Sequence, residues 1–305
     1  MDDERAAGGA TSTGDAAGAS GAASMEVAAG ARGAATAFSD ELRAAAAEVW
    51  EAQHAHPFVR GIGDGSLSRE RFQHFVRQDY VYLVDYGRLL ALACARAPEL
   101  ATMRSFAELT QAILVTEMDL HRAFAADWGI VPAALEAEPA TPTTRAYVDF
   151  LLRTAALGDF AELVAALLPC MWGYAEVGER LAAAQAGAVV SPGTAALPGA
   201  PASPVAVVSP GAPASPVAAA SPGAAASPAA SASPAGPANP YARWIATYAD
   251  PEFQALATWC RELMDRLGAT ADAPTRARLH AAFTTCSRHE LAFWDAAWRL
   301  EPAPA

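Results

Sequence analysis

The chain reads His56-Pro57-Phe58-Val59-Arg60-Gly61-Ile62-Gly63-Asp64-Gly65-Ser66-Leu67 between two segments whose apolar residues recur at three- and four-residue spacing. Those segments, at about 39–54 and 68–96, have the periodicity of amphipathic helices. Three glycines within five residues interrupt the pattern, and glycine adopts backbone conformations that other residues avoid. We therefore expect these glycines to form the turn between the first two helices.

The same helical spacing continues along the chain outside two low-complexity segments, without an alternating run or an Asn-Gly hairpin turn. Further helices are predicted at 100–128, 143–156, 159–184, 241–249, 252–267 and 274–298. The residues that suit helix ends are Ser39, Ser68 and Asp159 as N-caps, Pro251 and Pro274 in first turns, and Gly129, Gly158 and Gly268 at C-termini. Several long helices with wide apolar faces predict an all-α bundle with a pocket between crossing helices.

Two segments have compositions that cannot make a core. Residues 1–36 are mainly Ala, Gly, Ser and Thr, and we expect a disordered tail there. Residues 186–239 carry no charge and repeat Ser-Pro every six residues from Ser203 to Ser233. Because proline fixes φ and removes a backbone donor, this stretch is expected to be a solvated insertion. One helical domain, over residues 37–305 and interrupted by the insertion, is predicted.

Charge and cysteine usage narrow the class of function. The formal net charge is −12 and the sequence pI about 4.9, so neither nucleic acid nor an anionic membrane is expected as a partner. The four cysteines form no Cys-x-x-Cys pair, which suits reduced thiols in the cytoplasm better than a disulfide framework or a zinc site. The start of the chain has neither a secretory nor a transit pattern. The apolar run from Phe160 to Met171 is too short to span a bilayer.

Three positions stand out as candidates for chemistry. Cys170 follows Pro169 in an apolar helical segment, and Tyr174 shares its face one turn later. It is either a small buried filler or a nucleophile. Asp79 lies in the long second helix with Tyr82 three residues on. It is either a solvent-facing acid or a carboxylate that binds an N–C–N edge between tyrosine walls.

Glu290 is the third candidate, in the segment His289-Glu290-Leu291-Ala292-Phe293-Trp294. Its opening resembles a zinc-protease helix, but Phe293 replaces the second histidine, so no metal is expected. Among aromatic residues its charged form would be disfavoured, which suits a proton donor near neutral pH. An ordinary exposed glutamate is the alternative. Glu117 and His121, one turn apart, lack the Glu-x-x-His motifs and further carboxylates of a di-iron bundle. We expect these two residues to form a surface pair or a buried structural hydrogen bond.

Several segments in order resemble the TenA family. They are His56 to Gly65, Gln78-Asp79, Glu117 to Arg122, Ala165 to Trp172, Glu176 to Glu179, Trp244 to Tyr248, and Glu290 to Trp294. The resemblance implies a haem-oxygenase-like helical fold without haem, a homotetramer, and no cofactor. It also implies an aminopyrimidine aminohydrolase, or thiaminase II, that acts on 4-amino-5-aminomethyl-2-methylpyrimidine or thiamin in thiamin salvage.

The resemblance also implies roles for individual residues, in the branch of the family that has an active-site cysteine. Cys170 would be the nucleophile, Glu290 the acid/base, and Tyr82 would raise the nucleophilicity of the thiol. Asp79 would bind the aminopyrimidine edge, and the substrate would be lined by Tyr174 and Tyr248.

One position departs from the family pattern. Leu114 stands where many members carry a tyrosine that faces the pocket, so the loss of a hydroxyl there is expected to affect substrate preference. A non-catalytic thiamin- or aminopyrimidine-binding regulator is therefore the alternative function. An oxygenase or oxidase on the same fold is disfavoured by the missing metal ligands. The fold alone does not decide among these functions.

Overall fold

The computed structural model describes residues 36–189 and 239–304, and in these ranges the chain is helical with no strand. The all-α prediction is therefore confirmed for this part of the chain. The predicted N-terminal tail and nearly all of the predicted insertion lie outside the described residues. The helices are α1 (Phe38–Ala45), α2 (Ala47–Ala55), α3 (Pro57–Asp64), α4 (Arg69–Arg96), α5 (Leu100–Gln111), η1 (Ala112–Glu117), α6 (Met118–Asp127), α7 (Pro132–Glu136), α8 (Pro142–Leu157), α9 (Phe160–Val189), α10 (Ala242–Tyr248), α11 (Pro251–Thr270) and α12 (Ala273–Arg299).

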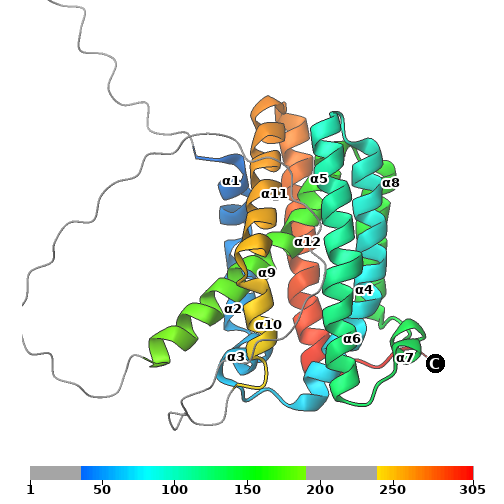
Figure 1. The fold of residues 1–305 in the computed structure, drawn as a ribbon. Helices are drawn as coiled ribbons and strands as arrows, with labels where there is room; N and C mark the ends of the chain where they lie inside the picture. Colours follow the sequence, from blue (N-terminus) through cyan, green and yellow to red (C-terminus); the bar gives the residue numbers. More distant parts are fainter. Residues whose placement is uncertain (1–35, 190–238, 305) are drawn as a thin grey trace, which may run out of the picture. The chain divides into compact units, whose positions relative to one another are not determined.

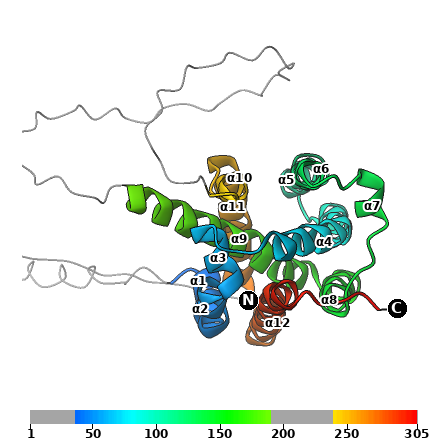
Figure 2. The same cartoon turned by 90° about the horizontal axis from the view of Figure 1, so that it is seen from below.

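Helices α9 and α12 form the centre of the helical unit. Helix α9 packs against α8, α10, α11 and α12, and α12 also contacts α2, α4 and α8. Figure 2, viewed end on, shows α12 with α8 on one side and α1 and α2 on the other. Figure 1 shows α9 crossing the bundle obliquely, which brings its middle turns close to α4 and α12. Side chains from helices far apart in the sequence can therefore meet around the middle of α9.

The glycine-rich stretch is a helix rather than the expected turn. Residues Pro57–Asp64 form α3, and only Gly65 has the left-handed backbone, with φ of 78° at the C-cap. Gly61 serves close packing instead, because a Cβ there would lie 3.0 Å from atoms of Leu67. The start of α3 is capped by His56, whose Nδ1 accepts a hydrogen bond from the Phe58 N–H at 3.1 Å.

The predicted helix ends are mostly confirmed. Ser68 caps α4, and Asp159 and Glu162 cap the start of α9 reciprocally, each side chain accepting from the other residue's N–H at 2.9 and 3.2 Å. Two predictions are wrong. Ser39 lies inside α1, where its N–H donates to Asp265. Gly268 lies inside α11, where it lets Phe38 pack against the helix backbone.

The predicted helix at 100–128 is divided by a π-helical segment. Residues Ala112–Glu117 form η1 between α5 and α6. A π turn adds a residue to the ordinary turn and rotates the side chains that follow it. The register of this segment therefore departs from the one that a continuous α-helix would give. The pattern also failed to indicate the break between α1 and α2 and the short helix α7.

Helix α9 is unusually long and apolar. Over Phe160–Gly187 it has the length and composition of a membrane-crossing helix, with a mean hydropathy of 1.3. However, 67% of that apolar window is buried by the other helices. Its apolar side chains therefore pack within the bundle, as expected for a central helix.

Candidate active site

A small cavity lies where α4, η1, α9, α10 and α11 meet. Its volume is only about 10 Å³, which is room for about one water molecule. Its lining residues are Asp79, Tyr82, Leu83, Tyr86, Ile113, Glu117, Cys170, Met171, Tyr174, Tyr248 and Phe253. A larger cavity of about 500 Å³ lies at the start of α4, but it contains no thiol. The smaller cavity is the better candidate because it gathers the groups that can do chemistry.

The structure brings the six predicted site residues together. Five line the cavity: Asp79, Tyr82, Cys170, Tyr174 and Tyr248. Glu290, on α12, is buried and is not among the lining residues, but it lies close enough to Cys170 to raise the pKa of the thiol. The spacing of Asp79 and Tyr82 on α4, and of Cys170 and Tyr174 on α9, places each pair on one face of its helix.

His121 fixes the position of Asp79. Its Nε2 lies 2.7 Å from Asp79 Oδ2, and its Nδ1 lies 2.9 Å from the backbone oxygen of Glu117. Since a carbonyl oxygen and a carboxylate both accept hydrogen bonds, both ring nitrogens act as donors. Burial alone would lower the pKa of His121, but the hydrogen bond and charge of Asp79 outweigh it and raise that pKa. We therefore assign a buried imidazolium–carboxylate pair.

Cys170 faces the cavity as a half-buried thiol. Burial, and then the nearby Glu290 carboxyl, raise its pKa well above the usual range. The Tyr82 hydroxyl opposes this rise in pKa. That hydroxyl makes no hydrogen bond within ordinary distance limits to any described residue, so we treat it as a near neighbour of the sulfur rather than a bonded partner. At neutral pH Cys170 is thus a protonated thiol.

Glu290 is a buried carboxylic acid, with 2% of its surface exposed. Tyr147 on α8 donates a hydrogen bond from its hydroxyl to Glu290 Oε1, and the same hydroxyl lies 3.2 Å from Cys286 Sγ. Burial raises the pKa of Glu290 to about 8, despite the hydrogen bonds that favour its charged form. The carboxyl is therefore protonated at neutral pH and can donate a proton. The alternative of an exposed glutamate is wrong.

Glu117 is a site residue that the sequence did not indicate. Its Oε1 accepts a hydrogen bond from the Tyr248 hydroxyl at 2.7 Å. Burial, and then the charge of Asp79, raise its pKa to about 7. Glu117 and His121 were expected to form a surface pair or a structural hydrogen bond. The hydrogen bond is present, through the backbone of Glu117, but the carboxyl itself lines the cavity.

The expectation that Leu114 stands at the pocket-facing position is wrong. Leu114 is 40% exposed and packs against Gly87, whereas Ile113 is 3% exposed and lines the cavity. The π turn of η1 accounts for the difference, because it shifts which side chain points inward. The pocket wall is apolar here as expected, but Ile113 makes it so.

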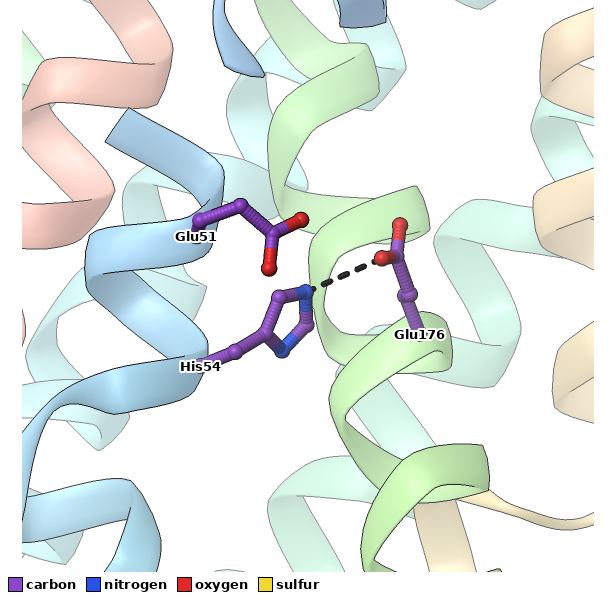
Figure 3. A group of neighbouring side chains, drawn as sticks. All are labelled: Glu51, His54 and Glu176. Atoms are coloured by element: carbon purple, nitrogen blue, oxygen red, sulfur yellow. Dashed lines mark hydrogen bonds and ion pairs between the residues drawn. The ribbon is translucent and has the colours of Figure 1, made fainter. Parts of the chain in front are cut away.

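A second group of ionisable side chains lies outside the cavity (Figure 3). Glu51, His54 and Glu176 lie close enough to share a metal ion. However, Arg43 already bridges the two carboxylates at 2.9 and 3.1 Å, and Arg180 pairs with both. Burial alone would raise the pKa of Glu176, but hydrogen bonds from His54 and Arg43 lower it to about 2. We interpret the group as an ion-pair network that joins α1 and α2 to α9.

Comparisons with known proteins agree with this arrangement. The sequence model of the TENA/THI-4/PQQC family matches residues 43–192 and 213–300. A Halalkalibacterium halodurans protein named aminopyrimidine aminohydrolase is 36% identical over 262 residues, which is 86% of this chain and 96% of that protein. A solved Silicibacter structure, described as a TenA family transcription regulator, has a TM-score of 0.65 and 28% identity, over 85% of this chain and 96% of the other.

The fold prediction is confirmed in the same way. A Shewanella denitrificans domain with a heme oxygenase-like fold superposes with a TM-score of 0.56, at 10% identity, over 86% of this chain and 92% of the other. At that identity the likeness concerns the fold alone. The family match is much more specific, because it covers most of the described helices and the segments that carry Asp79, Cys170 and Glu290. The chain belongs to the TENA/THI-4/PQQC family.

Proposed function

We propose that this protein is an aminopyrimidine aminohydrolase that works by cysteine nucleophilic catalysis. Its proposed reaction is the hydrolysis of 4-amino-5-aminomethyl-2-methylpyrimidine to the 5-hydroxymethyl compound and ammonia, with thiamin as a second substrate, in thiamin salvage. The observation that carries the proposal is a thiol, Cys170, that lines one cavity with the buried Asp79 carboxylate and lies near the buried Glu290 carboxylic acid. The relative named aminopyrimidine aminohydrolase supports the same reaction.

Asp79 is suited to hold the pyrimidine. Its carboxylate can accept hydrogen bonds from the 4-amino group and from a protonated ring nitrogen, which together form a donor edge. Its bond to His121 fixes its orientation before the substrate arrives. Tyr174 and Tyr248, whose ring centroids are 5.0 Å apart, give the ring aromatic surfaces to pack against.

The first chemical step joins the sulfur to the ring. Glu290 gives its proton to a ring nitrogen while Cys170 Sγ forms a bond to the neighbouring ring carbon. The thiol proton passes to the Glu290 carboxylate, so the net transfer is from sulfur to ring nitrogen. Because this route never needs a free thiolate, the raised pKa of Cys170 is compatible with catalysis.

Addition of sulfur makes the side-chain nitrogen a better leaving group. The nitrogen on the 5-methylene carbon is a protonated primary ammonium group. The lone pair of the 4-amino group moves into the ring, the C–N bond at the 5-methylene carbon breaks, and neutral ammonia leaves. Water then adds its oxygen to the exocyclic methylene, and its released proton converts ammonia to ammonium. Finally the C–S bond breaks, the ring nitrogen loses its added proton, and Cys170 is restored as a thiol.

The cavity must widen before a pyrimidine can enter. In this structure it holds room for about one water molecule, which is far too little for a six-membered ring. The proposed chemistry therefore requires some of the lining side chains to move on binding.

Ammonia release from 4-amino-5-aminomethyl-2-methylpyrimidine tests the proposal. Wild type should release ammonia stoichiometrically with the hydroxymethyl product, and Cys170→Ser should lose at least about a thousandfold in kcat, as expected for loss of a nucleophile. An exposed-residue variant, Glu48→Gln on α2, is the matched control and should keep wild-type rates. Full activity of Cys170→Ser would refute the nucleophile.

A regulator that binds without turnover is the second candidate. It is favoured by the similar Silicibacter protein, which is described as a TenA family transcription regulator. In that case wild type would bind the pyrimidine, as measured by calorimetry, but release no ammonia over hours. Turnover by wild type excludes this candidate.

A further inference from the structure

A second cavity, of about 350 Å³, adjoins the small cavity that contains Cys170, and we call the two the outer and the inner cavity. The outer cavity is lined by Ala112, Ile113, Thr116, Glu117, Thr247, Asp250, Glu252, Phe253 and Leu256. Three of these residues, Ile113, Glu117 and Phe253, also line the inner cavity. The two spaces therefore share a wall, and η1 and the first turn of α11 supply it.

Acidic side chains line both cavities, and no basic side chain is among the described residues that line them. Glu117, Asp250 and Glu252 line the outer cavity, and Asp79 and Glu117 line the inner one, whereas no Lys or Arg is among the described residues that line either. The His121 cation is already paired with Asp79. Asp250 is partly engaged, because its Oδ1 caps α11 by accepting from the Glu252 N–H at 2.8 Å. Glu117 is the carboxyl that faces both spaces.

Glu117 has one oxygen available for a ligand. Tyr248 donates to Oε1, and no described residue donates a hydrogen bond to Oε2. A carboxylate that is half-buried between apolar side chains interacts more strongly with a cation than one in water does. Because Glu117 lines both cavities, its carboxyl is shared by the cavity that holds the thiol and by the outer cavity.

We infer that Glu117 and the outer cavity form a subsite for a positively charged nitrogen group carried on the 5-methylene carbon of the pyrimidine. The inference rests on the proposed function, since it assumes that the pyrimidine lies beside Cys170 and Asp79. The substrate class is then an aminopyrimidine with a cationic substituent, either a primary ammonium or a larger heterocyclic cation. The volume of the outer cavity and the apolar Ile113 and Phe253 allow the larger group.

The subsite also separates substrate from product. The departing group is cationic in the substrate, but the hydroxymethyl product is neutral at the same position. A carboxylate at Glu117 therefore stabilises the bound substrate without stabilising the bound alcohol to the same extent. The structure thus links substrate selection to product release through one side chain.

Ligand binding tests this inference apart from turnover. Isothermal titration at pH 8 compares two ligands, the 5-aminomethyl and the 5-hydroxymethyl pyrimidine, in a Cys170→Ser background that stops the reaction. Glu117→Gln in that background should weaken binding of the aminomethyl compound by about tenfold or more, as for loss of a charge-assisted hydrogen bond, and of the hydroxymethyl compound by less than about threefold. Glu48→Gln, at an exposed position on α2 that lines neither cavity, is the matched control and should leave the affinity for either ligand unchanged.

Two further variants separate charge from structure. Tyr248→Phe removes the hydrogen bond but keeps the carboxylate, so the preference for the aminomethyl ligand should remain. Glu117→Asp should keep part of that preference. Equal weakening of both ligands by Glu117→Gln, or no weakening at all, would overturn the subsite. Failure of the Cys170→Ser protein to bind either pyrimidine would instead refute the proposed function.

Discussion

Replacing Glu290 with glutamine should abolish catalysis and yet stabilise the protein at alkaline pH. The carboxyl is 2% exposed, and burial raises its pKa to about 8 from an ordinary value of 4.5. The folded protein therefore binds the proton more tightly than the unfolded chain does. The tighter binding of this proton adds to the free energy of unfolding. That contribution is fully present below pH 4.5 and is lost as the pH rises towards 8.

The size of the effect follows from the two pKa values. A tenfold difference in proton affinity is worth about 1.4 kcal/mol, so the free energy of unfolding should fall by about 4 kcal/mol between pH 5 and pH 8.5 through Glu290 alone. Glutamine does not ionise, so the variant lacks this fall. The amide oxygen of glutamine can still accept the hydrogen bond from Tyr147, which limits other changes at the site.

Urea unfolding of the wild type and Glu290→Gln at the two pH values measures this difference. The variant should gain stability relative to the wild type as the pH rises, and the contributions of other titrating groups cancel in the comparison. The exposed Glu48→Gln variant is the control and should follow the wild type. If the difference between Glu290→Gln and the wild type were the same at both pH values, the assignment of Glu290 as a buried neutral acid would be wrong.

Three other changes give distinct outcomes. Tyr147→Phe removes a hydrogen bond that lowers the pKa of Glu290, so the loss of activity at alkaline pH should move to higher pH in a rate profile. Gly178→Ala would put a Cβ 2.5 Å from the Tyr248 backbone, so it should lower the free energy of unfolding by about 1–3 kcal/mol and raise KM. Gly173→Ala is the control on the same helix. It has open space beside it, so it should be neutral or stabilising in a thermal melt. Removal of residues 190–238, which lie outside the described structure, should leave kcat/KM within about twofold, because closure entropy depends weakly on loop length; a large loss of activity in a folded protein would contradict this.

Local pattern singled out three candidates for chemistry, because each stands out from its own helix, but it left an alternative open at each, and the roles came from the resemblance to the family. Asp79 interrupts an apolar face, Cys170 follows a proline within α9, and Glu290 lies among aromatic residues. Tyr147 could not be found in this way. It lies on α8, and its bond to Glu290 depends on how α8 packs against α12, which no local spacing encodes. The same limit applies to the Tyr248–Glu117 bond between α10 and η1.

The error at Leu114 has a different physical cause. The resemblance to the family placed Leu114 at the face of the pocket, but η1 departs from the regular α-helical register and Ile113 lines the cavity instead. The error at residues 57–64 is similar, because three glycines indicate a turn by propensity. There, tight packing of Gly61 on Leu67 compensates for the low helix propensity of glycine.

The protonation states in the cavity suggest why the thiol is kept inactive until the substrate binds. A thiolate at Cys170 would sit beside Glu290 and near Asp79 and Glu117, and each of these carboxyls raises the pKa of the thiol. The His121 cation cannot offset them, because Asp79 already pairs with it. No Lys or Arg is among the described residues that line this cavity, so a substrate that carries positive charge and a basic ring nitrogen supplies a counter-charge for the acids and an acceptor for the thiol proton. On this reasoning, nucleophile activation depends on the substrate itself, and the acidic lining that suppresses the resting thiolate is also what selects a cationic pyrimidine.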